Sequence, residues 1–254
     1  MQPSNSTFAQ VFNSLPVSQL LTVAKEIQQR IQTDASLVTL KDKTEYVTKA
    51  DYALQQIILD YFAQSALAGT YRICSEETLD QDQQVQVTNP TWELILDPLD
   101  GTTAFCEQKD TWGVMIGARD LQGQIVYSWN LVSTGEVYST SSAVTQLIDS
   151  VNTQLERVDI YDYGVNKTQF FSQQTAYPAA VWTGWQLYQN HLDGLLWLPS
   201  NAGKKTYPAY DLIFLGALSA QGWLVHTEKV AGQINKVAVA RNQHHLNQLL
   251  TLSV

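Results

Sequence analysis

Cysteine is scarce in this sequence: Cys74 and Cys106 are the only two among 254 residues. Two thiols cannot build a disulfide framework or a cysteine-rich zinc site. We therefore expect a protein of the reducing cytoplasm, in which both thiols serve as small buried hydrophobic side chains. Because both lie near acidic motifs, a redox switch is the alternative interpretation.

The sequence also lacks long apolar runs and basic segments. No run of about 18 apolar residues could span a membrane, and the first residues have neither the basic start nor the apolar stretch of a signal peptide. The net charge is −9, and no cluster of Lys and Arg interleaved with aromatic residues offsets it. Such a chain would repel a phosphodiester backbone. We expect neither a membrane nor a nucleic-acid polymer as a partner.

What is present is enough apolar sequence, 44% of the residues, for one large domain or two closely packed lobes. Apolar residues recur at helical spacing in residues 17–32 and 49–62, which predicts two amphipathic helices. The polar segment 37–48 between them predicts a mobile loop or a short hairpin. Helical patterns occur again in 184–196 and 209–221, and residues 236–250 are typical of a strand followed by a helix.

From residue 71 the pattern changes to short apolar segments that predict strands, and two of them end in carboxylates. These are YRICSEET, residues 71–78, and TWELILDPLDGTTAF, residues 91–105. Segments 112–119, 124–131 and 135–140 follow at short spacing, so we expect an antiparallel meander. Sheets with helices packed on them give an α/β (α+β) fold. We place a lobe boundary near residue 142, between an N-terminal lobe of residues 1–142 and a C-terminal lobe of residues 143–254.

The most informative segment is DPLDGTT, residues 97–103. Side chains three apart on a strand point to opposite faces, so Asp97 and Asp100 converge only if the chain turns between them. Pro98 and Gly101 predict that turn. Two carboxylates and the exposed Leu99 carbonyl suit magnesium, which prefers oxygen ligands. The backbone N–H groups and hydroxyls of residues 101–103, where a helix can begin, suit a phosphate.

Structural interpretations compete with each of these functional ones. The segment could be a surface turn whose Asp and Thr side chains cap a helix. Glu76 and Glu77 end a predicted strand, and adjacent glutamates at such a position commonly have no function. Thr48 and Asp51 fit a capping box at the start of the helix predicted over 49–62. Capping is compatible with function, because a capping Asp51 could still bond a hydroxyl of the site.

Three motifs in this order resemble the inositol monophosphatase-like phosphatases, a superfamily that includes fructose-1,6-bisphosphatases and 3′(2′),5′-bisphosphate nucleotidases. VTKAD, SEET and LILDPLDGTTAF are similar to the family segments VTxAD, GEES and DPxDGTxNF. Tyr210-Asp211 before LIFLGALSAQG resembles the family's Trp-Asp motif less closely. The resemblance covers residues 45–140 well and 180–254 loosely. It implies a layered α-β-α-β-α sandwich of the sugar phosphatase type, with the site between the lobes, and a homodimer.

The resemblance also implies a role for each matching residue. Glu76, Asp97 and the Leu99 carbonyl would bind one magnesium ion, and Asp97, Asp100 and Asp211 a second, with two or three ions per site. The catalytic residues would be Asp51, Glu76 and Thr102, with Thr102 bonded to Asp51 and orienting a metal-bound water. Asp100, Gly101, Thr102 and Thr103 would contact the substrate phosphate, and Glu77 would support the neighbouring groups.

The implied function is magnesium-dependent, lithium-sensitive hydrolysis of a small-molecule phosphate monoester, namely an inositol phosphate, a sugar phosphate or a 3′-phosphonucleotide. The sequence departs from the family pattern at Ala104, which replaces an Asn, at Tyr210, which replaces the Trp, and at Gln221, where relatives often have Glu. The C-terminal part is also shorter than usual. No departure removes an expected metal ligand. The alternative is a non-catalytic or weakly active metal- or metabolite-binding relative of the same fold.

Overall fold

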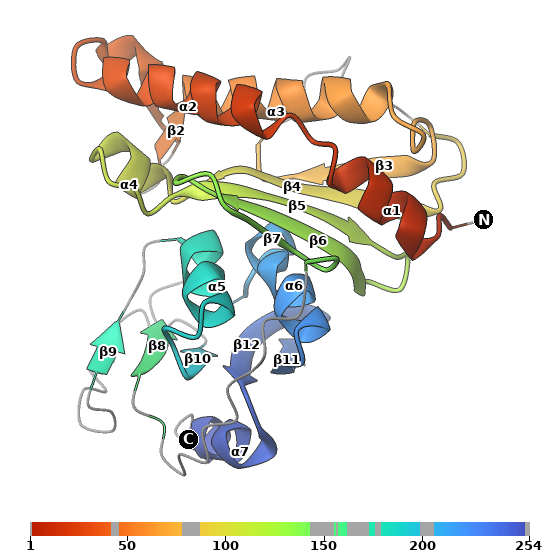
Figure 1. Ribbon diagram of the computed structural model, residues 1–254, viewed down its shortest axis with the longest axis vertical. Helices are drawn as coiled ribbons and strands as arrows, with labels where there is room; N and C mark the ends of the chain where they lie inside the picture. Colours follow the sequence, from red (N-terminus) through yellow and green to blue (C-terminus); the bar gives the residue numbers. More distant parts are fainter. Residues whose placement is uncertain are drawn as a thin grey trace.

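The computed structural model describes residues 2–41, 46–77, 87–142, 155, 157–161, 173–175, 179–198 and 206–251. Within these residues, helices and sheets alternate in layers: helices, a five-stranded sheet, helices, a second five-stranded sheet and a last helix (Figure 1). The α-β-α-β-α sandwich implied by the resemblance is confirmed. The lobe boundary expected just after residue 142 falls at 143–154, outside the described residues, and stays a prediction.

The first layer contains α1 (Asn5–Phe12), α2 (Val17–Ile31) and α3 (Lys49–Ala63). Helices α2 and α3 confirm the two helices that apolar spacing predicts, whereas α1 was not predicted. The segment between them contains the 3-10 turn η1 (Ala35–Leu37) and the antiparallel pair β1 (Val38–Leu40) and β2 (Tyr46–Thr48). The hairpin interpretation of this segment is therefore confirmed for its described residues.

The first sheet has the order β3 (Tyr71–Ser75), β4 (Trp92–Asp100), β5 (Gly113–Arg119), β6 (Ile125–Val132) and β7 (Val137–Ser139). Strand β3 runs parallel to β4, and the remaining pairs are antiparallel, which confirms the predicted meander. Short helix α4 (Thr102–Cys106) follows β4.

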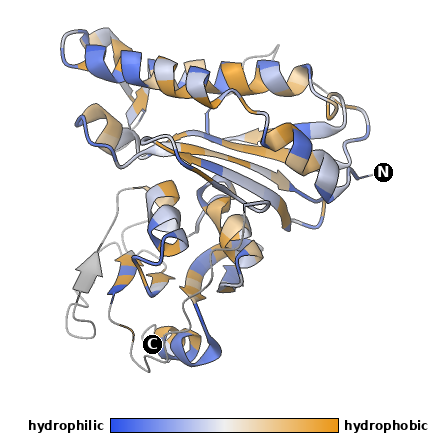
Figure 2. Ribbon diagram, viewed as in Figure 1, coloured by the Kyte–Doolittle hydropathy of each residue, from blue (hydrophilic) through white to orange (hydrophobic). Residues whose placement is uncertain are grey.

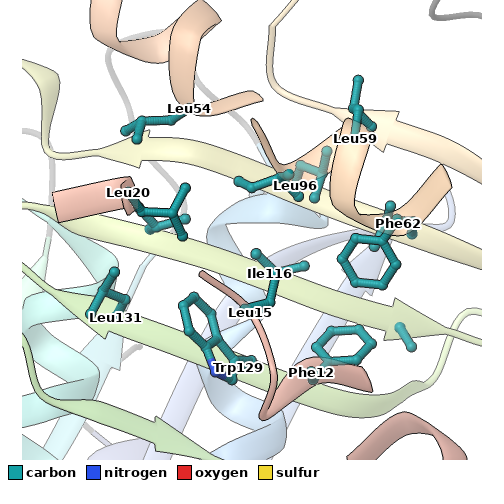
Figure 3. Packing of buried hydrophobic residues seen from close by; sticks show 14 of the residues in the cluster. Phe12, Leu15, Leu20, Leu54, Leu59, Phe62, Leu96, Ile116, Trp129 and Leu131 are labelled. Atoms are coloured by element: carbon teal, nitrogen blue, oxygen red, sulfur yellow. The ribbon is translucent and has the colours of Figure 1, made fainter. Parts of the chain in front are cut away.

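The outer face of this sheet carries the largest apolar cluster. Figure 3 shows Leu20, Leu54 and Phe62 on the helices packed toward strand residues Leu96 and Trp129. All five side chains are buried. Because fully burying one such side chain contributes about 1.5–3 kcal/mol, this face alone fixes the helices on the sheet.

The middle layer covers the inner face of the same sheet. It consists of α5 (Ala180–Tyr188), the 3-10 turn η2 (Tyr210–Leu212) and α6 (Phe214–Ala220). Helix α6 lies close to β6 because Gly216 has no side chain: a Cβ there would stand 2.7 Å from Ile125 Cγ2. The helical pattern predicted over 209–221 is thus confirmed, with a 3-10 start.

The second sheet has the order β11 (Leu224–Val230), β12 (Gln233–Ala240), β10 (Gly194–Trp197), β8 (Arg157–Tyr161) and β9 (Gln173–Thr175). Helix α7 (Gln243–Thr251) packs on its outer face, so the strand and helix predicted over 236–250 are confirmed. In Figure 2 the exposed sides of α2 and α7 carry hydrophilic residues. No described helix combines the length and apolarity needed to cross a membrane.

The helix predicted over 184–196 is correct only in its first part. Helix α5 ends at Tyr188, and Asn190 has a φ of +60°, a left-handed conformation that stops the helix. The chain then enters β10 at Gly194. Apolar residues in a short segment fit both a helix and a buried strand, and here the strand is stabilised by pairing with β8 and β12.

Candidate active site

A β-bulge in β4 brings Asp97 and Asp100 to one face of the first sheet. Asp97 pairs with Met115 and Asp100 with Gly113, so two residues of β4 lie opposite one residue of β5. One extra residue reverses the alternation of side chains beyond it. The prediction of a turn at Pro98 is wrong, because the strand continues to Asp100 and a bulge takes the place of the turn. Pro98 is tolerated there because a bulge leaves its missing N–H without a ladder partner.

The burial of the neighbouring residues shows which face this is. Leu94, Leu96 and Leu99 all pack in the outer cluster. Leu96 and Leu99 are three residues apart, so they share a face only because the bulge between them reverses the alternation of side chains. Ile95 packs instead in the inner cluster with α5 and α6. Asp97 and Asp100 therefore point into the space between the first sheet and the middle helices.

Two further acids reach the same place from different elements. Glu76 directly follows β3, which runs parallel to β4, and its N–H donates to Leu96 O at 3.0 Å. Asp211 lies on η2, which packs on β4 and β5. Both carboxylates act electrostatically on Asp97 and Asp100. The structure thus brings together the four acidic side chains that the resemblance assigns to one metal site.

The electrostatics of this cluster are unfavourable without a cation. Asp97 is 2% exposed, and burial together with the charges of Glu76, Asp100 and Asp211 raises its pKa well above the usual value. Burial likewise raises the pKa of Asp100, although the Val181 N–H lowers it in part. Asp97 Oδ1 is buried and accepts no hydrogen bond from the described chain. A buried carboxylate oxygen in this state needs a proton or a positive charge.

The four carboxylates of the cluster suit a hard divalent cation, because such a cation prefers oxygen ligands. Among the described residues, however, no three Asp, Glu, His or Cys side chains are already grouped as a metal site. Asp97 shares a hydrogen bond with Glu76, and Asp100 Oδ2 accepts from Val181 N at 2.5 Å. A cation would have to replace the first of these bonds.

Thr102 and Asp51 lie next to the cluster, and Asp51 performs the predicted capping. Asp51 Oδ2 accepts from both the N–H and the hydroxyl of Thr48 at 2.7 Å. Its Oδ1 lies 3.5 Å from Thr102 Oγ1, at the long limit of a hydrogen bond. The Thr102 hydroxyl is closer to Leu99 O, at 3.0 Å. Burial raises the pKa of Asp51 to about 7.

Gly101 connects β4 to α4 in a conformation that other residues avoid. Its φ is +88°, and a Cβ there would stand 2.8 Å from both Ala179 Cβ and Thr111 O. The chain can therefore turn directly from Asp100 into α4. The first N–H groups of a helix have no partner within it, so those of Thr102 and Thr103 remain for other acceptors.

The sequence matches the model of the inositol monophosphatase family over residues 10–177. The chain belongs to this family. The match includes Asp51, Glu76, Asp97 and Asp100, whereas Asp211 lies beyond it. A search of curated proteins found no match.

Several solved structures share the fold of this chain over nearly its whole length, although their sequence identity to it is low. The extragenic suppressor protein SuhB from Bartonella henselae is 16% identical, with a TM-score of 0.74 over 96% of this chain and 95% of that one. Inositol monophosphatase from Anabaena (Nostoc) is 14% identical, with a TM-score of 0.67 over 98% and 97%. An IMPase/NADP phosphatase complexed with Mg²⁺ and phosphate is 11% identical, with a TM-score of 0.65 over 92% and 93%.

Glu77 is held by a lysine that the sequence analysis did not single out. Lys41 Nζ lies 3.0 Å from Glu77 Oε1 and 3.9 Å from Glu76 Oε1. Burial lowers the pKa of Lys41, but its bond to Glu77 and the nearby acids raise it by more. Glu77 is 3% exposed, so Lys41 compensates a buried charge beside the cluster. The only sequence signal was the polar character of segment 37–48.

None of the departures from the family pattern is one of the four clustered acids. Ala104 is buried on α4, Tyr210 packs with the inner cluster, and Gln221 Nε2 donates to Ser142 O at 3.0 Å. Cys74 and Cys106 are unpaired and half-buried. Burial raises the pKa of both thiols, that of Cys106 to about 11. A redox switch requires a thiolate, so this environment favours the structural interpretation.

Proposed function

We propose that this chain is a magnesium-dependent phosphatase that hydrolyses a small-molecule phosphate monoester. The observation that carries the proposal is the bulge in β4, which turns Asp97 and Asp100 to one side and places Asp97 Oδ1, buried and without a hydrogen bond, among Glu76, Asp100 and Asp211. Membership of the inositol monophosphatase family supports a phosphatase of this superfamily.

Magnesium ions, two or three per site, would be held by oxygen ligands only. Glu76, Asp97 and the Leu99 carbonyl form one set, and Asp97, Asp100 and Asp211 form the other. The Leu99 carbonyl accepts from Thr102 Oγ1 and keeps a second lone pair for a cation. When bound, such ions lower the pKa of a water and stabilise negative charge on the leaving oxygen.

The remaining groups bind and orient the substrate. The N–H groups and hydroxyls at Gly101, Thr102 and Thr103 would bind phosphate oxygens, next to the Asp100 side chain. Thr102, between Leu99 O and Asp51, would hold the attacking water by a hydrogen bond. Asp51, with a pKa near 7, can accept a proton at neutral pH.

The substrate class we propose is an inositol phosphate, a sugar phosphate or a 3′-phosphonucleotide. Trp197 stands where the resemblance to inositol-specific relatives places a sugar-contacting Glu. It is buried, and its ring packs 5.5 Å from that of Phe214. Because Trp197 fills the core and offers no carboxylate, we rank inositol phosphate below the other two. We further propose a cytoplasmic homodimer, as the resemblance implies.

Hydrolysis of a panel of phosphate monoesters tests this proposal, with each compound measured in magnesium and in excess chelator. We expect turnover of at least one compound in magnesium and none in chelator, with inhibition by lithium. Turnover that is unchanged in chelator would contradict the magnesium mechanism. The absence of turnover with every compound would favour the alternative, a relative that binds metal or metabolites without catalysis.

A further inference from the structure

A second pocket lies away from the acidic cluster, between the far end of the first sheet and the second sheet. Its volume is about 310 Å³. Residues from the β5–β6 turn, from η2 and α6, and from β11 and β12 line it, and none of the acids described above is among them. Strand β5 runs away from α4 toward this end (Figure 1). Ala209 and Leu212, which lie on either side of Asp211 in the sequence, line the pocket, whereas Asp211 does not. The pocket therefore borders η2 but shares none of its lining residues with the four acids.

About half of the pocket wall is apolar. Leu212 and Leu215 are buried, and Ile125, Val225 and Ile234 pack as half-buried residues against the inner cluster. Pockets of about 300 Å³ are at the lower end of those that bind small organic molecules. The apolar part of the wall thus suits a compact aromatic or aliphatic body.

The ionisable groups that line the pocket are both positive. They are Arg119 and Lys229, in a chain with a net charge of −9. Lys229 is exposed and forms no ion pair or hydrogen bond within the described chain. It lines the pocket together with Val225 and Thr227 of the same strand.

Arg119 is held by Glu93, but part of its guanidinium group is still available to bind a ligand. Its Nε lies 2.5 Å from Glu93 Oε2, and Glu93 also pairs with Arg72. Glu93 is thus shared between two guanidinium groups, and no described residue accepts from the Nη atoms of Arg119. The nearby acid Asp120 instead accepts the N–H groups of Gln122 and Gln124 in its own turn. No acidic side chain among the described lining residues competes for Arg119 and Lys229.

We propose that this pocket binds a small amphipathic anion, with an apolar body between Leu212, Leu215 and Val225 and an oxyanion head at Arg119 and Lys229. A guanidinium matches carboxylate and phosphate-type heads equally in geometry. Polar side chains at Ser219, Thr227 and Gln124 complete the rim. The site is independent of phosphate hydrolysis.

Calorimetry with defined probes tests this binding site. The probes are 2-naphthoate, the non-hydrolysable 2-naphthylphosphonate and the neutral 2-naphthamide, all in chelator so that no metal at the acidic cluster attracts an anion. We expect at least one anion to bind about tenfold more tightly than the amide, the gain typical of a hydrogen bond to a charged group. The anion that binds more tightly shows whether the pocket prefers a carboxylate or a phosphate-type group.

Variants distinguish this pocket from other sites. Ser219 is exposed at the end of α6, so Ser219→Trp fills the pocket without disturbing the core and should abolish binding. Ser219→Met is the smaller alternative if that variant does not fold. Lys229→Gln should weaken the anions but not the amide, and Lys25→Gln, at an exposed lysine of α2, should change nothing. No binding to the wild type, equal binding of the amide, or unchanged binding to Ser219→Trp would overturn the proposal.

Discussion

The carboxylate of Asp100 caps helix α5: Asp100 Oδ2 accepts a hydrogen bond from the backbone N–H of Val181 at 2.5 Å. The residue at the N-cap position of α5, Ala179, provides no side-chain bond. A carboxylate at a helix N-terminus typically contributes about 0.5–2 kcal/mol. Asp100 therefore has a structural role besides its proposed role as a ligand, because it ties α5 to the bulge in β4.

The tight connection at Gly101 predicts a large effect of adding one methyl group. Gly101→Ala would combine the strain of a φ of +88° with contacts of 2.8 Å to Ala179 Cβ and Thr111 O. Gly123→Ala is a matched control, because Gly123 has the same φ and nothing within 4 Å of the added atom. We expect a loss of about 1 kcal/mol for the control and at least about 3 kcal/mol for Gly101→Ala in denaturant unfolding. Equal losses would show that the close packing is not needed.

The raised pKa of Asp51 predicts that stability falls as pH rises. The folded-state pKa is about 7, against about 3.9 in an unfolded chain, so the folded protein binds the extra proton between these values. Between pH 6 and pH 8, in chelator, Asp51 should cost about 1.4 kcal/mol of unfolding free energy. Chemical denaturation at both pH values, on wild type and Asp51→Asn, measures this. An identical pH dependence in the two proteins would rule it out.

Asp193 should stabilise the second sheet at neutral pH. It accepts the Arg157 N–H at 3.0 Å and pairs with the Arg157 guanidinium at 3.0 Å, while Arg241 lies 3.8 Å away. Although burial raises the pKa of Asp193, these bonds lower it by more. We expect Asp193→Asn to lose about 2 kcal/mol at pH 7.

The sign of the Asp193 effect can be checked by titration. A carboxyl whose pKa is lowered in the folded state stabilises the protein above the unfolded pKa of about 3.9, and that contribution disappears as pH falls through the lower folded value. The difference between wild type and Asp193→Asn should therefore shrink in acid unfolding experiments. Glu107→Gln, at an exposed pair with Lys109, serves as the control and should be close to neutral. A difference that grows in acid would contradict the assignment.

Local pattern was sufficient for much of the fold. The spacing of Leu20, Leu54 and their neighbours predicted α2 and α3, and the short apolar segments predicted the strands β3 to β7. Periodicity could not locate the end of α5 at Tyr188, because a short apolar segment fits a helix and a buried strand equally. It also missed α1, whose length of eight residues gives little periodic signal.

The candidate site was predictable in part. Glu76 and Asp97 are neighbours because β3 runs parallel to β4. The strand pattern predicted both strands and the acids that follow them, but not the pairing. The contribution of Asp211 came only from family resemblance, since it lies 114 positions beyond Asp97 and meets it through tertiary packing. The bulge, the cap from Asp100 to Val181, the ion pair of Lys41 and Glu77 and the second pocket all depend on contacts between distant segments, which no local pattern reports.

We propose that Asp97 serves as an oxygen ligand shared by two cations. The most direct measurement compares magnesium binding and phosphate-monoester turnover in wild type and Asp97→Asn. We expect the variant to lose measurable magnesium binding and several orders of magnitude in kcat, while remaining folded, because it removes a buried charge that repels Glu76, Asp100 and Asp211. Magnesium binding and turnover close to wild type in the folded variant would contradict the account.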